Sequence, residues 1–240
     1  MKTLLALSAS ALFLTTACGI GGGGRTIGTG PIVDNERIVE AFDEIDNETS
    51  LDLVITQGDV QRVTVSAEAD VQAVLKTEVK GDRLTITANG NLNGTSGGEA
   101  RRILITVAQV ENFVNDGSGD ASIEGFDADK IQVKLDGSGD FEIRESEFDN
   151  VTIDADGSGD IRLDGRGNDL SVKTDGSGDV DAYDWAAEDV VVEAKGSGNV
   201  RVRADDKLKV KLSGSGNVYY RGNPNLQLDD TGSGEVKADN

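Results

Sequence analysis

Apolar and polar residues alternate on both sides of a tripeptide that recurs along the second half of the chain. In every repeat, an apolar residue stands four positions before and four positions after the first glycine, and a further one stands six positions after it. This alternation predicts two short strands per repeat, joined at a corner. The Gly-Ser-Gly corners begin, 18 to 20 residues apart, at Gly117, Gly137, Gly157, Gly176, Gly196, Gly214 and Gly232.

A near-constant period of this length, with two strands per repeat, is typical of one coil of a parallel β-helix. One coil cannot bury its apolar face alone, whereas stacked coils form a continuous core. A meandering antiparallel sheet is the alternative, but its hairpins would reverse direction and need not repeat one corner. The corner glycines supply either a positive φ or an approach too close for a side chain.

The first half of the chain is less regular. Strands are expected at Leu51–Thr56, Arg62–Ala67, Val74–Val79, Arg83–Ala88 and Arg101–Val107, with a polar, Gly-rich surface loop at Asn89–Ala100. Arg101 and Arg102 are expected to be solvated at a strand start. We predict one β-helix domain over residues 32–240, with irregular N-terminal coils and a cap at 32–112 and regular repeats at 113–240.

The N-terminus has the pattern of an export signal. Lys2 is followed by the apolar run Leu4–Leu14 and then by small residues up to Cys18, the only cysteine. Residues 1–17 are therefore expected to be a signal peptide. The sequence before Cys18 resembles the lipobox of bacterial lipoproteins, so Cys18 is the predicted lipidation site and residues 18–31 a Gly-rich tether. The alternative is an ordinary signal peptide with a cysteine near its cleavage site.

The repeated Asp-Gly-Ser-Gly-Asp corners, downstream of a segment such as Phe42–Asn89, resemble the family called putative auto-transporter adhesin, head GIN domain. The resemblance covers roughly residues 38–238. It implies that the β-helix is right-handed, and the family name implies adhesion. The family brings no catalytic residues to place on this chain.

Composition excludes several kinds of function. The formal net charge of −21 opposes binding to nucleic acid or to anionic lipid through charge. The chain has no histidine, so Cys/His zinc sites and Ser-His or Cys-His nucleophilic pairs are excluded. A disulfide within the chain is impossible because Cys18 is the only cysteine.

Pairs of acidic residues flank the first four corners. Stacked carboxylates repel one another, so either hydrogen bonds from corner amides or a bound cation must offset the repulsion. Turn capping is the simpler interpretation, because the later corners keep only Asp, Asn or Glu after the tripeptide. The candidate ligands for calcium or another divalent cation are Asp116, Asp120, Asp136, Asp140, Asp156, Asp160, Asp175 and Asp179.

Two aromatic residues are candidates for contact with a sugar or a partner. Tyr183 and Trp185 fall in a segment, Asp181–Glu188, that is expected to be a loop. They either pack over a corner or contact a ligand. The serines of the corners have no histidine to activate them and are expected to be structural.

Together these features predict an exported, membrane-anchored, non-enzymatic interaction module of the cell envelope. We expect anchoring in the outer membrane, on a face that the sequence does not indicate, no required cofactor, and an unidentified protein or glycan partner. The alternatives are a carbohydrate-active β-helix enzyme or sugar-binding protein, and a structural protein that self-associates through its ends. The charged end Lys237–Asn240 favours a monomer.

Overall fold

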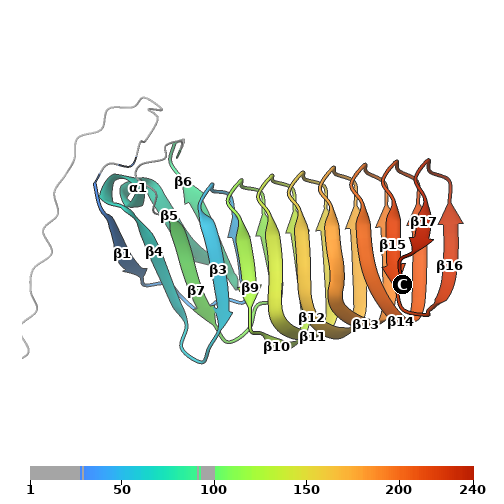
Figure 1. The fold of residues 1–240 in the computed structure, drawn as a ribbon. Coiled ribbons are helices and arrows are strands. Elements are labelled where there is room, and N and C mark those ends of the chain that lie inside the picture. Colours follow the sequence, from blue (N-terminus) through green and yellow to red (C-terminus); the bar gives the residue numbers. More distant parts are fainter. Residues whose placement is uncertain (1–27, 29, 91, 93–100) are drawn as a thin grey trace, which may run out of the picture.

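The computed structural model describes residues 28, 30–90, 92 and 101–240, and the strands of this part form one continuous sheet (Figure 1). The elements are β1 (Ile32–Arg37), β2 (Glu44–Asn47), β3 (Asp52–Gln57), β4 (Arg62–Glu68), α1 (Ala69–Val74), β5 (Leu75–Lys80), β6 (Arg83–Ala88), β7 (Arg102–Val107), β8 (Asn112–Asn115), β9 (Ala121–Glu124), β10 (Asp127–Leu135), β11 (Phe141–Ala155), β12 (Ile161–Thr174), β13 (Val180–Ala194), β14 (Val200–Leu212), β15 (Val218–Arg221), β16 (Asn225–Asp230) and β17 (Val236–Ala238).

The repeats form the coils of a parallel β-solenoid, as the period predicts. Each long strand from β11 to β14 starts after one Gly-Ser-Gly corner, bends at the opposite edge, and ends at the next corner. The coils stack in the register that the sequence alignment implies: Phe113 pairs with Val133, Val133 with Ile153, and Ile153 with Val172. These columns are buried, so each coil closes the core of its neighbour.

The corner glycines are required by close backbone approach. None of them has a positive φ. A Cβ on Gly137 or Gly139 would instead lie well under 3.0 Å from a carbonyl oxygen of the preceding coil. The amide of Ser138 donates to the carbonyl oxygen of Gly117 at 3.2 Å, and the same bond recurs at each later corner. The sequence left open a positive φ or a close approach as the reason for these glycines, and the structure shows that the reason is the close approach.

The N-terminal region, where we expected irregular coils and a cap, contains antiparallel strands as well as parallel coils. Antiparallel pairs β1–β4, β4–β7 and β5–β6 join the parallel coils. The coil β2–β3 lies between β6–β7 on one side and β8–β9 on the other, so chain order and coil order differ. Alternation of apolar residues is the same in parallel coils and antiparallel hairpins, which is why the pattern could not separate them.

The strands β1, β4 and β5 and helix α1 form an N-terminal cap on the solenoid (Figure 1). Within this cap, Gln72 of α1 is buried, and its side-chain amide donates to the carbonyl oxygens of Val33, Val65 and Ala67 at 2.6 to 3.4 Å. These bonds attach α1 to β1 and β4 across the end of the core. The end of the solenoid that carries α1 is therefore closed by packed, hydrogen-bonded structure.

The opposite end is open. The last coil is β16 with β17, and among the strands that the structure describes β16 pairs only with β14, on one side. Leu226 and Leu228 are 36% and 49% exposed, whereas Leu208 and Val210, their counterparts in the preceding coil, are 0% and 1% exposed. The ladder of apolar residues thus ends in solvent at the C-terminal coil.

Candidate functional site

The acidic residues that follow the corners form a hydrogen-bonded ladder along one edge of the solenoid. Each side-chain oxygen accepts the backbone amide of the equivalent residue in the next coil. Asp120 accepts from Asp140 at 2.9 Å, and Asp140 accepts from Asp160 at 2.8 Å. The ladder starts at Asp52, which accepts from Asp120, and continues through Asp160, Asp179, Asn199 and Asn217 to the amide of Glu235.

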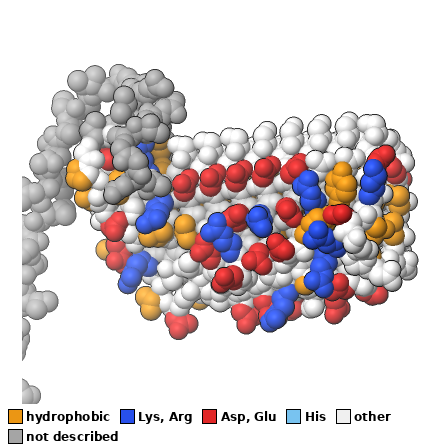
Figure 2. Space-filling view, in the orientation of Figure 1, with side chains coloured by type: hydrophobic (Ala, Val, Ile, Leu, Met, Phe, Trp, Pro, Cys, Tyr) orange, Lys and Arg blue, Asp and Glu red, His pale blue; other side chains and the backbone are white. Residues whose placement is uncertain are grey.

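This geometry is the turn capping that the sequence favours, but the cap reaches across to the neighbouring coil. Asn199 and Asn217 make the same bond as the aspartates, so the position needs an acceptor oxygen and does not need a charge. Figure 2 shows the resulting row of acidic side chains along the coils, next to the edge formed by the corners.

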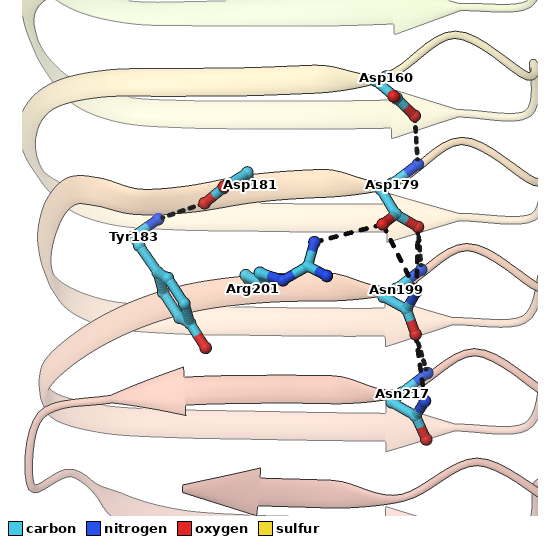
Figure 3. Close-up of polar contacts among 7 residues, drawn as sticks. All are labelled: Asp160, Asp179, Asp181, Tyr183, Asn199, Arg201 and Asn217. Atoms are coloured by element: carbon cyan, nitrogen blue, oxygen red, sulfur yellow. Dashed lines mark hydrogen bonds and ion pairs between the residues drawn. The ribbon is translucent and has the colours of Figure 1, made fainter. Parts of the chain in front are cut away.

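Asp179 is the ladder residue whose pKa is lowered, and Figure 3 shows its contacts. Partial burial would raise its pKa, but hydrogen bonds from the Asn199 amide and from Arg201, at 2.8 and 3.2 Å, outweigh burial and hold the pKa below its usual value. The carboxylate is therefore stabilised in its charged form at the point where the ladder changes from Asp to Asn.

The acidic residues that precede the corners do not converge. Asp116, Asp136, Asp156 and Asp175 are exposed on successive coils. In the part of the chain that the structure describes, no group of three or more acidic side chains is arranged to hold a metal ion. The eight aspartates proposed as cation ligands thus form two rows of single carboxylates, one of which caps backbone amides.

Trp185 is not available for contact with a ligand, and the expectation of a surface loop at Asp181–Glu188 was wrong. The segment is part of β13, and the Trp185 side chain is 0% exposed. The indole packs against Gly165 and Gly167 of the preceding coil, where a Cβ on Gly165 would lie 2.8 Å from the ring. Packing, the alternative to ligand contact, is therefore the role of Trp185, although it packs on β12 and not over a corner.

Tyr183 lies on the surface, in a cluster that fastens the last residues of the chain. Its hydroxyl donates to a carboxylate oxygen of Asp239 at 2.9 Å, and the Arg221 guanidinium lies 3.9 Å from the centre of its ring. Burial, the hydrogen bond and the charge of Asp239 raise the pKa of Tyr183 to about 12. Arg221 also donates to the backbone oxygen of Asp239 at 3.1 Å. The cluster ties Asp239 to residues of β13 and β15, and one face of the tyrosine ring is covered.

Cys18, the predicted lipidation site, lies outside the described residues. The structure does show where the chain enters the domain. Gly28 is buried against the ion pair between Glu68 and Arg101, in which Nε of Arg101 lies 2.8 Å from Glu68. Arg101 was expected to be solvated, but its side chain is 13% exposed and that of Glu68 is 1% exposed. The N-terminal segment therefore meets the domain at the capped end.

The structure also reveals a corner that the sequence search missed. A Cβ on Gly117 would clash with the Thr49 carbonyl oxygen, and one on Gly119 with that of Leu51, so Thr49–Leu51 is the corner beneath them. Counted from Thr49, Ile45, Leu53 and Ile55 occupy the ladder positions of the later repeats. The spacing of these apolar residues could have identified this corner in the sequence, even though it lacks the glycines.

The bends at the other edge of the coils border an open groove of about 640 Å³. It is lined by charged side chains, among them Glu145, Glu147, Arg166, Asp184 and Arg203. Glu145 has a φ of 48°, an unusual value outside glycine, at the point where the register of β11 and β12 shifts. The groove is within the size range of small-ligand sites, but it is polar and shallow.

A family model for the putative auto-transporter adhesin, head GIN domain, matches residues 41–224. The chain belongs to this family. A putative adhesin from Bacteroides fragilis has the same fold, with a TM-score of 0.83 and 21% identity over 88% of this chain and 98% of that one. No curated protein shows a significant match.

Two further solved structures with this fold come from Parabacteroides distasonis. One is described as a putative lipid binding protein, with a TM-score of 0.70 and 23% identity, covering 90% of this chain and 100% of that one. The other, a putative adhesin, has a TM-score of 0.66 and 22% identity over the same shares. These likenesses show that the overall fold is shared with these proteins. Within the described ranges, no helix is long and apolar enough to cross a membrane.

Proposed function

We propose that this head GIN protein is an exported, lipid-anchored interaction module of the cell envelope that acts by binding and performs no catalysis. The family supports an adhesin-like role at the cell surface or in the envelope. The anchor is Cys18, which carries the acyl chains, and the proposed location is the outer membrane.

The entry of the chain at the capped end is the observation that carries this proposal. Gly28 packs against the buried Glu68–Arg101 pair, and β1 begins shortly after it. The ten residue steps from Cys18 to Gly28 span at most about 35 Å. An anchor at Cys18 would hold the capped end near the membrane and leave the C-terminal coils, at the other end of Figure 1, farthest from it.

Metabolic labelling with a fatty acid tests the anchor. We expect label in the whole chain and none in a Cys18→Ser variant, with the unsubstituted chain in the membrane fraction and the variant released from it. An Ile20→Ala variant, altered close to the same cysteine, is the control and should be labelled normally. Equal membrane retention of the Cys18→Ser variant, without label, would contradict the lipid anchor.

Sugar binding is a second candidate, because the groove at the bends combines carboxylates with two arginines. Planar carboxylate and guanidinium groups can each bond to two neighbouring hydroxyls of a sugar. A glycan panel probed with the whole chain and with an Arg203→Ala variant tests it. A glycan that binds both proteins equally would exclude this groove as the site.

A further inference from the structure

The open C-terminal end is an unpaired strand edge with an apolar stripe. All six residues of β16 are exposed, and Leu226 and Leu228 stand in columns whose members are buried in the coils before them. Proteins normally cover or distort such edges. Here the cap closes the first coil, but within the described residues nothing covers the last one.

The hydrogen-bonding groups that this edge presents can be assigned. The amide of Thr231 donates to the carbonyl oxygen of Leu212 in β14 at 2.8 Å. Because amide directions alternate along a strand, Gln227 and Asp229 also point their backbone groups toward β14. Leu226 and Leu228 therefore direct their N–H and C=O groups away from the solenoid, at the side that lacks a neighbour.

The pattern of β16 is complementary to itself in an antiparallel arrangement centred on Gln227. In this register Leu226 lies opposite Leu228 of a second copy, and the two exchange both backbone hydrogen bonds. Gln227 lies opposite its own equivalent, in a pair without hydrogen bonds. Asn225 lies opposite Asp229, so no acidic residue of β16 faces another acidic residue.

From these observations we infer that the C-terminal coil docks on the C-terminal coil of a second copy of this chain through antiparallel β16 pairing. The interface is isologous, so one contact uses up both open ends and the assembly stops at a dimer. This inference differs from the monomer that Lys237–Asn240 favours in the sequence; the docking strand is β16, whereas Lys237 lies in β17. It needs no lipid anchor. If the anchor proposed above also holds, the dimer carries its two anchors at opposite ends and can join two membranes.

Charge limits the strength of this contact. Each copy carries a formal charge of −21, so two copies repel at long range. Salt screens this repulsion over about 10 Å at 0.1 M ionic strength, while apolar and backbone contacts change little. We expect dimerisation to strengthen as sodium chloride is raised, which is the opposite of a contact made by surface ion pairs.

Disulfide trapping tests the register. In the whole chain carrying Cys18→Ser, a Gln227→Cys substitution leaves one cysteine, placed at the two-fold centre. Opposite residues of a pair without hydrogen bonds have Cα atoms about 4.5 Å apart, which a disulfide can span. With air and copper phenanthroline as the oxidant, we expect rapid conversion to a covalent dimer. A Val60→Cys control, 71% exposed at the capped end, should cross-link far more slowly.

Sedimentation equilibrium tests the contact without a cross-link. The Cys18→Ser chain should move from 25.1 kDa toward twice that mass as its concentration rises to the order of 100 μM. Leu228→Lys should weaken the dimer at least about tenfold, with an unchanged melting profile because the side chain is half exposed, and Val60→Lys should not. The mass of a single chain in high salt would overturn the inference. Equal cross-linking rates at positions 227 and 60 would overturn it as well. So would a monomer whose β16 edge pairs with a strand of a different protein.

Discussion

The two ends of the solenoid solve the same physical problem in opposite ways. At the N-terminal end, antiparallel strands, α1 and the buried Glu68–Arg101 pair close the core. At the C-terminal end, the ladders stop at Leu226 and Leu228, and β16 keeps one edge unpaired. A stack of repeats needs its end coils protected from solvent and from other strands. The difference indicates that one end is built to be stable and that the other is available for contact.

The largest expected effect is at the capped end. Replacing Arg101 with leucine leaves the buried Glu68 carboxylate without its ionic partner, which we expect to cost about 3–5 kcal/mol of unfolding free energy. Urea denaturation measures the change. Lys207→Leu removes one side of a surface pair with Asp189 and should leave the midpoint nearly unchanged. Equal midpoints for the two variants would contradict a cap held by this ion pair.

The next largest effect comes from replacing a glycine with alanine, which should cost more stability at a corner of the coils than in the turn between β5 and β6. In Gly157→Ala the new methyl group would collide with the carbonyl oxygen of Gly137, so we expect a loss of about 3 kcal/mol or more. Gly81, between β5 and β6, has a φ of 63° and open space around it, so Gly81→Ala should cost only about 1–2 kcal/mol. Thermal unfolding of both variants checks the order, and a reversed order would show that the corners are looser than described.

A third comparison places one substitution in an inner coil and one at the open end. Val210 and Leu228 occupy the same column, but they are 1% and 49% exposed. Val210→Ala removes two buried carbon groups and should cost about 2 kcal/mol. Leu228→Ala should cost well under about 1 kcal/mol at low protein concentration, where no second copy covers it. Similar losses would mean that the last coil is covered in solution.

The smallest effect concerns the Asp ladder and depends on pH. Asp179→Asn keeps an acceptor for the Asn199 amide but loses the charge that faces Arg201. Because the folded-state pKa of Asp179 is below its ordinary value of 3.8, the charged group stabilises the fold above that pH, and the benefit disappears as pH falls through the folded-state pKa. The melting temperatures of wild type and variant should therefore differ at pH 7, and the difference should shrink as the pH falls below 3.8. A gap independent of pH would show that Arg201 contributes nothing.

The sequence predicts the repeated half of the molecule well, because there one pattern recurs. The columns through Val133 and Phe141 pair as the alignment of corners implies. The capping role of Asp120 and its successors also follows from residues that change from Asp to Asn while the acceptor is kept.

The antiparallel pairing of the cap strands could not be predicted in the same way. Strand alternation carries no direction, so antiparallel β4 and β5 look like coils in the sequence. Thr49 breaks the glycine pattern, and its buried hydroxyl bonds within its own corner, donating to Oδ1 of Asn47 at 2.8 Å and accepting from the amide of Leu51 at 3.2 Å. Trp185 looked like a surface aromatic, and only the structure shows that Gly165 and Gly167 leave room for its ring in the core.

Native-state hydrogen exchange at low protein concentration tests the asymmetry of the two ends most directly. We predict slow exchange for the amides of β3, β7 and the middle coils, and the fastest exchange among the strands at Leu226 and Leu228, whose amides face away from β14. Raising the protein concentration should slow exchange at these two residues and leave the cap unchanged. Amides of β16 that are as protected as those of β12 at low concentration would contradict an open C-terminal end.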